Sequence, residues 1–215
     1  MSSSRQTALV MTLPLVVILA GGEGRRIGGG KAVRSLGGEP LIERAIRAGR
    51  LWSDDVRLSL RTPEQISNIN LPILIDDPDI AGPLAGLWAA LLAARDAQRH
   101  LALTIACDVP FLPADLDQRL LAGIGEELAA VATSGPNLHP TCALWRVEAN
   151  DQLATYASSG HRSLIGFAEQ VGCTRVQCSE AELFNVNSLA DLAEAERKLA
   201  SEIPPLISPP ASTRF

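Results

Sequence analysis

Short apolar runs alternate along this chain with stretches in which apolar residues recur at helical spacing. The clearest run, residues 16–20, is rich in β-branched residues and is followed by glycines, which is typical of a buried strand. Strands are expected at residues 16–20, 56–60, 71–75, 101–106 and 129–133, and helices at residues 40–51, 86–94 and 114–121. This alternation predicts an α/β fold with a mostly parallel central sheet and helices on both faces.

The length of 215 residues suits a single domain, which we expect over residues 13–200. Residues 1–12 and 201–215 are polar or proline-rich and are expected to be flexible termini outside the fold. Hydrophobic residues make up 47% of the chain and charged residues 20%, as in an ordinary globular protein. The formal net charge of -5 argues against a nucleic-acid partner, because nucleic-acid-binding domains are normally basic.

An apolar run over residues 9–20 follows Arg5 and invites comparison with a signal peptide. Pro14 divides this run, and cleavage between Ala20 and Gly21 would start the mature chain in the middle of a glycine-rich loop. No other segment approaches the roughly 20 apolar residues that a membrane-spanning helix needs. We therefore expect a cytoplasmic protein without a membrane partner.

The first apolar run leads into a glycine-rich loop that carries Arg25, Arg26 and Lys31. Glycines let backbone N–H groups approach a phosphate closely, and the cations add positive charge at the same place, so the loop predicts binding of a nucleoside triphosphate. A Walker A loop is excluded because Arg25 stands where its first glycine belongs and Ala32 follows the lysine. The dinucleotide fingerprint is excluded because Ile27 holds the position of its third glycine.

A second candidate is Asp108, which follows the expected strand at residues 101–106. Cys107, directly before it, is expected to line the wall of the site and not to act as a nucleophile. A carboxylate at the end of a buried strand, held by Pro110, suits Mg²⁺, which takes one or two protein carboxylates and completes its shell with water and phosphate oxygens. Ligands of parallel sheets bind beyond the carboxyl ends of the strands. The glycine-rich loop, Asp76–Asp77 and Asp108 are therefore expected at one edge of the sheet.

Residues 19–28 resemble the L-A-G-G-x-G-x-R-M-G signature of nucleotidyltransferases. From about residue 15 to about residue 199, the chain resembles the molybdenum cofactor guanylyltransferases in an ordered set of blocks. These blocks are residues 19–22, 26–29, 31, 38–41, 82–86, 107–110, 139–141, 143–144 and 184–188. The resemblance implies a Rossmann-like three-layer fold of the nucleotide-diphospho-sugar transferase type.

The same resemblance implies transfer of GMP from GTP to the phosphate of molybdopterin, with Mg²⁺ as cofactor and release of pyrophosphate. Apoproteins of molybdenum enzymes, or their chaperones, are the protein partners that it implies. Gly21–Gly22 and residues 82–86 favour guanine, because the similar cytidylyltransferases tend to carry L-A-A-G in the first loop. Three alternatives stay open: cytidylyl transfer to molybdopterin, nucleotidyl transfer to another phosphorylated small molecule, and non-catalytic binding of GTP or the cofactor.

By resemblance, the nucleotide pocket is lined by four residues of the first loop: Leu19, Ala20, Gly21 and Gly22. Lys31 and Arg26 are expected on the triphosphate, where their positive charge would neutralise phosphate oxygens. Asp108 corresponds to the magnesium aspartate, and Asp77 is expected near the nucleoside. Ser59 stands where the family has an asparagine that contacts the nucleotide.

On the acceptor side, the resemblance places Asn185 and Asn187 near the pterin and the metal. Short amides suit this place because they can donate or accept hydrogen bonds to phosphate or pterin edges. Arg162 matches an arginine that would face the anionic cofactor.

Overall fold

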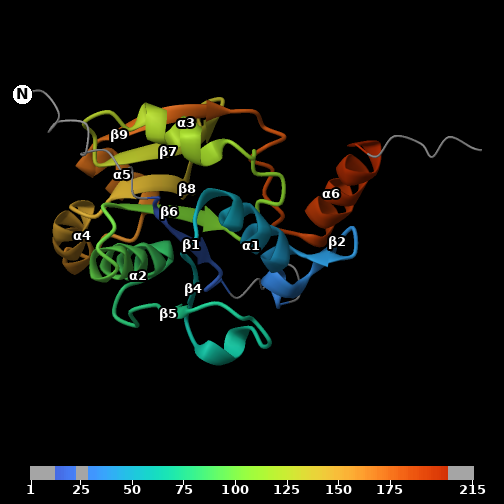
Figure 1. Cartoon of the computed structure of the whole chain (residues 1–215), viewed down its shortest axis with the longest axis horizontal. Helices are drawn as coiled ribbons and strands as arrows, with labels where there is room; N and C mark the ends of the chain where they lie inside the picture. Colours follow the sequence, from blue (N-terminus) through green and yellow to red (C-terminus); the bar gives the residue numbers. More distant parts are fainter. Residues whose placement is uncertain (1–12, 23–28, 203–215) are drawn as a thin grey trace, which may run out of the picture.

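The computed structural model describes residues 13–22 and 29–202, which form an α/β fold around a seven-stranded sheet (Figure 1). Its strands are β1 (Leu15–Leu19), β4 (Val56–Leu60), β5 (Ile73–Ile75), β6 (Leu101–Ala106), β7 (Ala129–Ser134), β8 (Asn137–Arg146) and β9 (Cys173–Cys178). They lie in the order β5-β4-β1-β6-β8-β7-β9. All neighbouring pairs are parallel except those of β8, which runs antiparallel to both β6 and β7.

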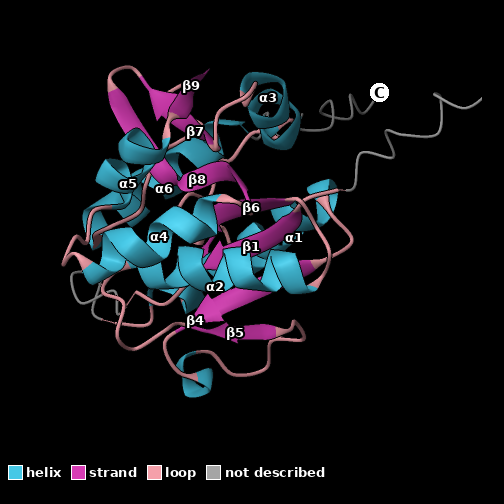
Figure 2. Cartoon of the chain, turned by 90° about the vertical axis from the view of Figure 1, so that its left-hand side faces the viewer, coloured by secondary structure: helices cyan, strands magenta, loops and turns pink. Residues whose placement is uncertain are grey.

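Helices cover both faces of this sheet, as Figure 2 shows for α2 and α4 on one face. The helices are α1 (Leu41–Trp52), α2 (Pro83–Asp96), α3 (Leu116–Gly123), α4 (Ala149–Ser158), α5 (Leu164–Val171) and α6 (Leu189–Glu202). One core lies between the sheet and helices α1 and α3, and a second lies between the sheet and helices α2, α4 and α5. The expected three-layer fold with a mostly parallel sheet is confirmed.

Strand β1 explains why the first apolar run has no polar position. Val16 and Ile18 belong to the core beneath α1 and α3, whereas Leu15 and Val17 belong to the opposite core. A strand with helices on both faces must be apolar on both sides. The run is therefore an interior strand of the sheet, and cleavage after Ala20 would remove it. Within the described residues, no helix combines the length and apolar character that crossing a bilayer requires.

The expected elements of the first half agree closely with the structure. The strands at residues 56–60 and 101–106 have the predicted bounds, while β5 begins two residues later than predicted, at Ile73. Helix α2 begins earlier than predicted because Pro83 occupies its first turn, where the missing N–H costs nothing. Helix α6 ends at Glu202, two residues beyond the expected domain end.

The second half contains elements that the pattern did not predict: β8, β9, α4 and α5. Strand β8 follows a turn between Ser134 and Asn137 and returns beside β7 as a hairpin. Pro140 interrupts the hydrogen-bonding pattern of β8, since proline cannot donate to a sheet ladder. At this level of the hairpin, the pairing register of β7 with β8 shifts between Val131 and Ala132. The bulge accommodates a residue that argues against a strand when only the sequence is read.

Helix α6 packs away from the sheet, beside the small hairpin of β2 (Ser35–Leu36) and β3 (Glu39–Pro40) (Figure 1). A third apolar cluster joins them and includes Leu36, Val186 and Ala195. The Gly37 backbone N–H also donates to Glu196 Oε1 at 2.8 Å. These contacts fix the C-terminal segment beside the loop that carries Lys31.

Candidate active site

A cavity of about 620 Å³ opens at the carboxyl ends of β1, β4, β5 and β6. Eight of the residues expected in the site line it: Leu19, Ala20, Gly21, Gly22, Lys31, Asp108, Asn185 and Asn187. The parallel ladder brings their elements together, because Leu19 pairs with Ser59 of β4 on one side and Ala106 of β6 on the other. The cavity therefore lies where ligands of parallel sheets bind.

Lys31 is the hub of the polar contacts in this cavity. It opens the short 3-10 helix η2 (Lys31–Val33), after Gly29 and Gly30, whose φ angles of 81° and 59° favour glycine. Its Nζ contacts Asp108 Oδ2 in an ion pair and donates to Asn187 Oδ1 at 2.8 Å. The Lys31 side chain is only 13% exposed and the Asp108 side chain 17%, so solvent screens this pair less than a surface pair.

The segment that contains both asparagines is held from two sides. The Val186 N–H donates to the Asp108 carbonyl at 2.9 Å, which fixes the segment to the end of β6. At the start of α6, Ser188 Oγ accepts from the Asp191 N–H, and Asp191 Oδ2 accepts from the Ser188 and Asn187 N–H groups at 2.8 and 2.9 Å. This reciprocal arrangement is a capping box with aspartate as its acid. The backbone N–H of Asn187 is the main cause that lowers the pKa of Asp191.

Two buried oxygen atoms in the cavity lack a hydrogen-bond partner: Asp108 Oδ1 and Asn185 Oδ1. Unpartnered buried acceptors are costly unless a donor or a cation satisfies them. Carboxylate and amide oxygens are also the donors that a hard divalent cation prefers. No group of three or more His, Cys, Asp or Glu side chains in the described residues has a metal-binding arrangement. The site thus fits a cation that takes one or two protein ligands and completes its shell with phosphate oxygens and water.

Asp76 and Ser59 form a second polar pair on the cavity wall. Ser59 Oγ donates to Asp76 Oδ1 at 2.5 Å. Burial raises the pKa of the Asp76 carboxyl, whereas the Ser59 hydroxyl and the positive charge of Arg61 oppose that rise. Sequence reasoning placed Asp76 at this edge only as part of the Asp76–Asp77 pair, and it did not find Arg61, which follows β4 directly and also lines the cavity.

The structure brings eight of the predicted residues together but not all eleven. Asp77 does not line the cavity, and its Oδ1 accepts from the Asp79 N–H at 2.9 Å. Arg162 is exposed and its side chain is not part of the described lining, although its backbone lies near Gly82. Arg26 lies outside the described residues. The predicted roles of Asp77 and Arg162 therefore have no direct cavity contact to support them.

Cys107 lies on the wall of the cavity, as predicted. Burial raises the pKa of its thiol to about 12, and the neighbouring Asp108 carboxylate acts in the same direction. The thiol therefore stays protonated at neutral pH and is a poor nucleophile.

A mostly parallel sheet whose first strand ends in a glycine-rich segment, with a lysine and an aspartate at the same edge, defines a nucleotidyltransferase-type protein. Comparison with known proteins agrees: residues 16–173 match the family model described as the MobA-like NTP transferase domain. The chain belongs to the family of molybdenum cofactor guanylyltransferases.

This membership rests on relatives that match over most of their length. A molybdenum cofactor guanylyltransferase of Cereibacter sphaeroides is 38% identical over 191 residues, which cover 86% of this chain and 97% of the relative. One of Nitrobacter hamburgensis is 37% identical over 195 residues, with 86% and 93% covered.

A solved structure agrees with the fold. The crystal structure of molybdopterin-guanine dinucleotide biosynthesis protein A from Archaeoglobus fulgidus has a TM-score of 0.72 at 24% identity, and the match covers 87% of this chain and 99% of that one.

Proposed function

We propose that this protein transfers GMP from GTP to the terminal phosphate of molybdopterin and releases pyrophosphate. The observation that carries the proposal is the convergence of Lys31, Asp108 and Asn187 in a cavity that also exposes the glycine-rich end of β1. Membership of the guanylyltransferase family supports GTP as the donor and the molybdenum cofactor as the acceptor. We further propose that the reaction takes place in the cytoplasm and needs no nucleic acid or membrane.

In this reaction an oxygen of the acceptor phosphate forms a bond to the α-phosphorus of GTP. The bond from that phosphorus to the oxygen bridging the α- and β-phosphates breaks, and pyrophosphate leaves with the electron pair. The attacking phosphate is already anionic at neutral pH, so no side chain has to become a nucleophile. The protonated thiol of Cys107 agrees with this scheme.

The protein's part is therefore positioning and neutralisation of charge. Lys31 supplies a partly buried positive charge for the triphosphate, and we assign Arg26 to the same task. Asp108, with Asn185 beside it, would hold a divalent cation, which we propose to be Mg²⁺. Such a cation supplies neutralisation of the charge on the phosphate oxygens. We assign Asn187 and Asn185 to the side of the cavity that receives the pterin phosphate.

The test is to incubate the protein with Mg²⁺, molybdenum-loaded molybdopterin and each nucleoside triphosphate in turn, and to identify the pterin product by mass. A GMP adduct formed with GTP alone supports the proposal. A CMP adduct would move the nucleotide assignment to cytosine, and no adduct despite bound GTP would contradict molybdopterin as the acceptor. Apoproteins of molybdenum enzymes or their chaperones, added to the finished reaction, would show whether they receive the product.

Replacement of Asp191 by alanine tests the positioning of Lys31. The change removes the acceptor that holds the Asn187 and Ser188 N–H groups, so helix α6 loses about 1 kcal/mol of stabilisation at its start. Asn187 then no longer holds Lys31 in one place, and we expect kcat for GMP transfer to fall by about 10-fold. The measurement is steady-state kinetics together with the melting temperature.

Asp151→Ala is the matched control for that variant, because Asp151 lies in the first turn of α4 and its side chain pairs with Arg95 at the surface. It should leave kcat unchanged. If Asp191→Ala and Asp151→Ala had the same kcat, the capping box would have no part in positioning the site.

A further inference from the structure

The ammonium group of Lys31 occupies oxygen atoms that a divalent cation would use. It contacts Asp108 Oδ2 and takes the Asn187 side-chain oxygen at 2.8 Å. Carboxylate and amide oxygens are the atoms that a hard cation prefers. In the structure, which holds no ligand between these residues, a side chain of the protein therefore lies where the charge of a bound cation is expected.

Lys31 and a divalent cation compete for Asp108. Both are drawn to the same carboxylate, and like charges that lie within a few ångströms repel one another. The repulsion is weakly screened here, because the Lys31 and Asp108 side chains are only 13% and 17% exposed. The ammonium group has also neutralised the carboxylate, so little negative charge is left to attract a free cation. We therefore expect the protein without nucleotide to bind a divalent cation weakly.

The Lys31 side chain can leave Asp108 without a change in the fold. Its charge lies at the end of a flexible four-carbon stem, whereas Asp108 and Asn187 are held by their backbone contacts. If the ammonium group moves to a phosphate, it releases Asp108 Oδ2 and Asn187 Oδ1 together. These two oxygens then join Asp108 Oδ1 and Asn185 Oδ1, the unpartnered buried oxygens of the same cavity.

We propose that Lys31 is an internal counter-ion that keeps Asp108 closed to divalent cations until a triphosphate binds. The triphosphate has more negative charge than one carboxylate, so it draws the ammonium group away and leaves Asp108 free for the cation. This inference rests on the proposed roles of Asp108 and Lys31. It adds an order of binding to them: the cation enters with the nucleotide and not before it.

A purely structural role of Lys31 predicts the opposite effect on cation binding. If Lys31 only held the Asp108 carboxylate in place, its loss would leave the carboxylate less well oriented, and a cation would bind more weakly or equally well. If Lys31 occupies the cation site, its loss removes a competing positive charge, and a cation binds more tightly. The sign of the change in affinity separates the two roles.

The experiment measures binding of Mn²⁺ alone to the whole protein and to its Lys31→Met variant. Free hydrated Mn²⁺ is measured by electron paramagnetic resonance, in the absence of nucleotide and pterin. We expect the variant to bind Mn²⁺ roughly 10- to 100-fold more tightly than the unmodified protein. Mn²⁺ should accordingly raise the melting temperature of the variant more than that of the unmodified protein, since a ligand of the native state stabilises it.

Two further substitutions of Lys31 separate its charge from its shape. Lys31→Gln also removes the charge and should bind Mn²⁺ as tightly as the methionine variant, so it replaces that variant if methionine prevents folding. Lys31→Arg keeps a positive charge beside Asp108, and its affinity for Mn²⁺ should stay as low as that of the unmodified protein.

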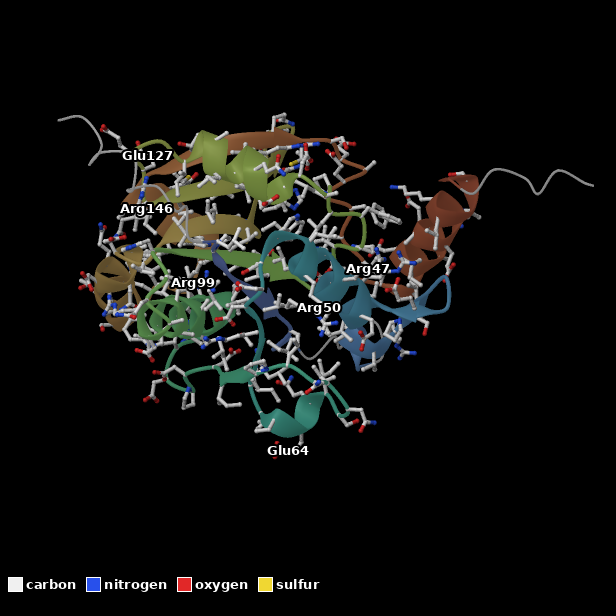
Figure 3. All side chains as sticks on the ribbon, in the orientation of Figure 1. Arg47, Arg50, Glu64, Arg99, Glu127 and Arg146 are labelled. Carbon is white, nitrogen blue, oxygen red and sulfur yellow. The ribbon has the colours of Figure 1, made fainter. Side chains whose placement is uncertain are left out.

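Arg47→Met is the matched control for the loss of a positive charge. Arg47 lies on α1 at the surface, where its guanidinium group is 62% exposed and pairs with Glu39 at 3.0 Å (Figure 3). The variant frees a carboxylate outside the cavity and changes the net charge of the protein by the same amount. Its affinity for Mn²⁺ should equal that of the unmodified protein.

Equal affinity for Mn²⁺ in the unmodified protein and in the Lys31→Met and Lys31→Gln variants would overturn the inference. It would also be overturned if the affinity gained by Lys31→Met persisted after Asp108→Asn was added, because the cation would then bind elsewhere. Failure of the proposed function is separate: it would appear as absent GMP transfer by the unmodified protein, whereas the Mn²⁺ measurements contain neither substrate.

Discussion

Replacing Asp108 by asparagine is expected to reduce GMP transfer by at least about 1,000-fold, with little change in the fold. One carboxylate oxygen of Asp108 contacts the Lys31 ammonium group, and the other is buried without a hydrogen-bond partner. The asparagine keeps the shape but removes the negative charge that a divalent cation and the lysine both need. Turnover would be measured with saturating GTP and Mg²⁺, and the fold would be followed by circular dichroism and the melting temperature.

Asp117→Asn provides a close control for the change at Asp108. Asp117 lies in the first turn of α3, and its Oδ1 is also buried without a partner, but it does not line the cavity. Both variants thus lose the charge of a carboxylate that has one buried, unpartnered oxygen. Near-normal turnover by Asp108→Asn, or an equal loss in Asp117→Asn, would remove Asp108 from the proposed chemistry.

Replacing Lys31 by methionine is expected to lower kcat by about 100- to 1,000-fold. Methionine keeps most of the apolar stem but removes the ammonium group that contacts Asp108 and Asn187. Charge that develops on the phosphates is then no longer neutralised, and Asp108 loses its partner. Arginine at this position should restore only part of the rate, because a planar guanidinium does not replace a compact point charge.

The chain offers a direct control, because its only lysines are Lys31 and Lys198. Lys198 lies on α6, where its Nζ pairs with Glu194 and sits 3.7 Å from the centre of the Phe184 ring. Lys198→Met should leave kcat unchanged. Acetylation followed by mass spectrometry gives a second measurement: GTP with Mg²⁺ should protect Lys31 and not Lys198. Equal modification of Lys31 with and without GTP would contradict its assignment to the triphosphate.

Local chemistry explains why much of the first half was predictable. The bounds of β4 follow from alternating apolar and polar residues, and those of β6 from a short, mostly apolar run. A run that is apolar at every position needs cover on both faces, which β1 has. The glycine-rich loop, Lys31 and Asp108 were found because each carries its chemistry in a few neighbouring residues. Strand β8 was missed because Pro140 argues against a strand unless the irregular pairing of β8 with β7 at this position is known.

The sequence does not determine which of the two carboxylates, Asp76 or Asp77, faces the cavity. Successive residues of an extended segment point to opposite sides, so only one of the two carboxylates can face the cavity. The pairing of Leu60 with Ile75, and the hydrogen bond from the Asp76 N–H to the Leu60 carbonyl, decide that it is Asp76. Neither contact has a signature in the sequence, because register depends on a partner strand.

The sequence by itself determined the α/β class, the buried first strand and the glycine-rich loop, and it singled out Lys31 and Asp108 as candidate site residues. These follow from periodicity and from chemistry within a few residues. The tertiary structure alone decided that Lys31 meets Asp108, 77 residues away, and Asn187, 156 residues away. It also decided that a capping box on α6 holds that contact and that Asp76 lies three strands from Asp108. Such contacts depend on strand order and helix packing, which are set by burial of apolar surface over the whole chain and not by any local pattern.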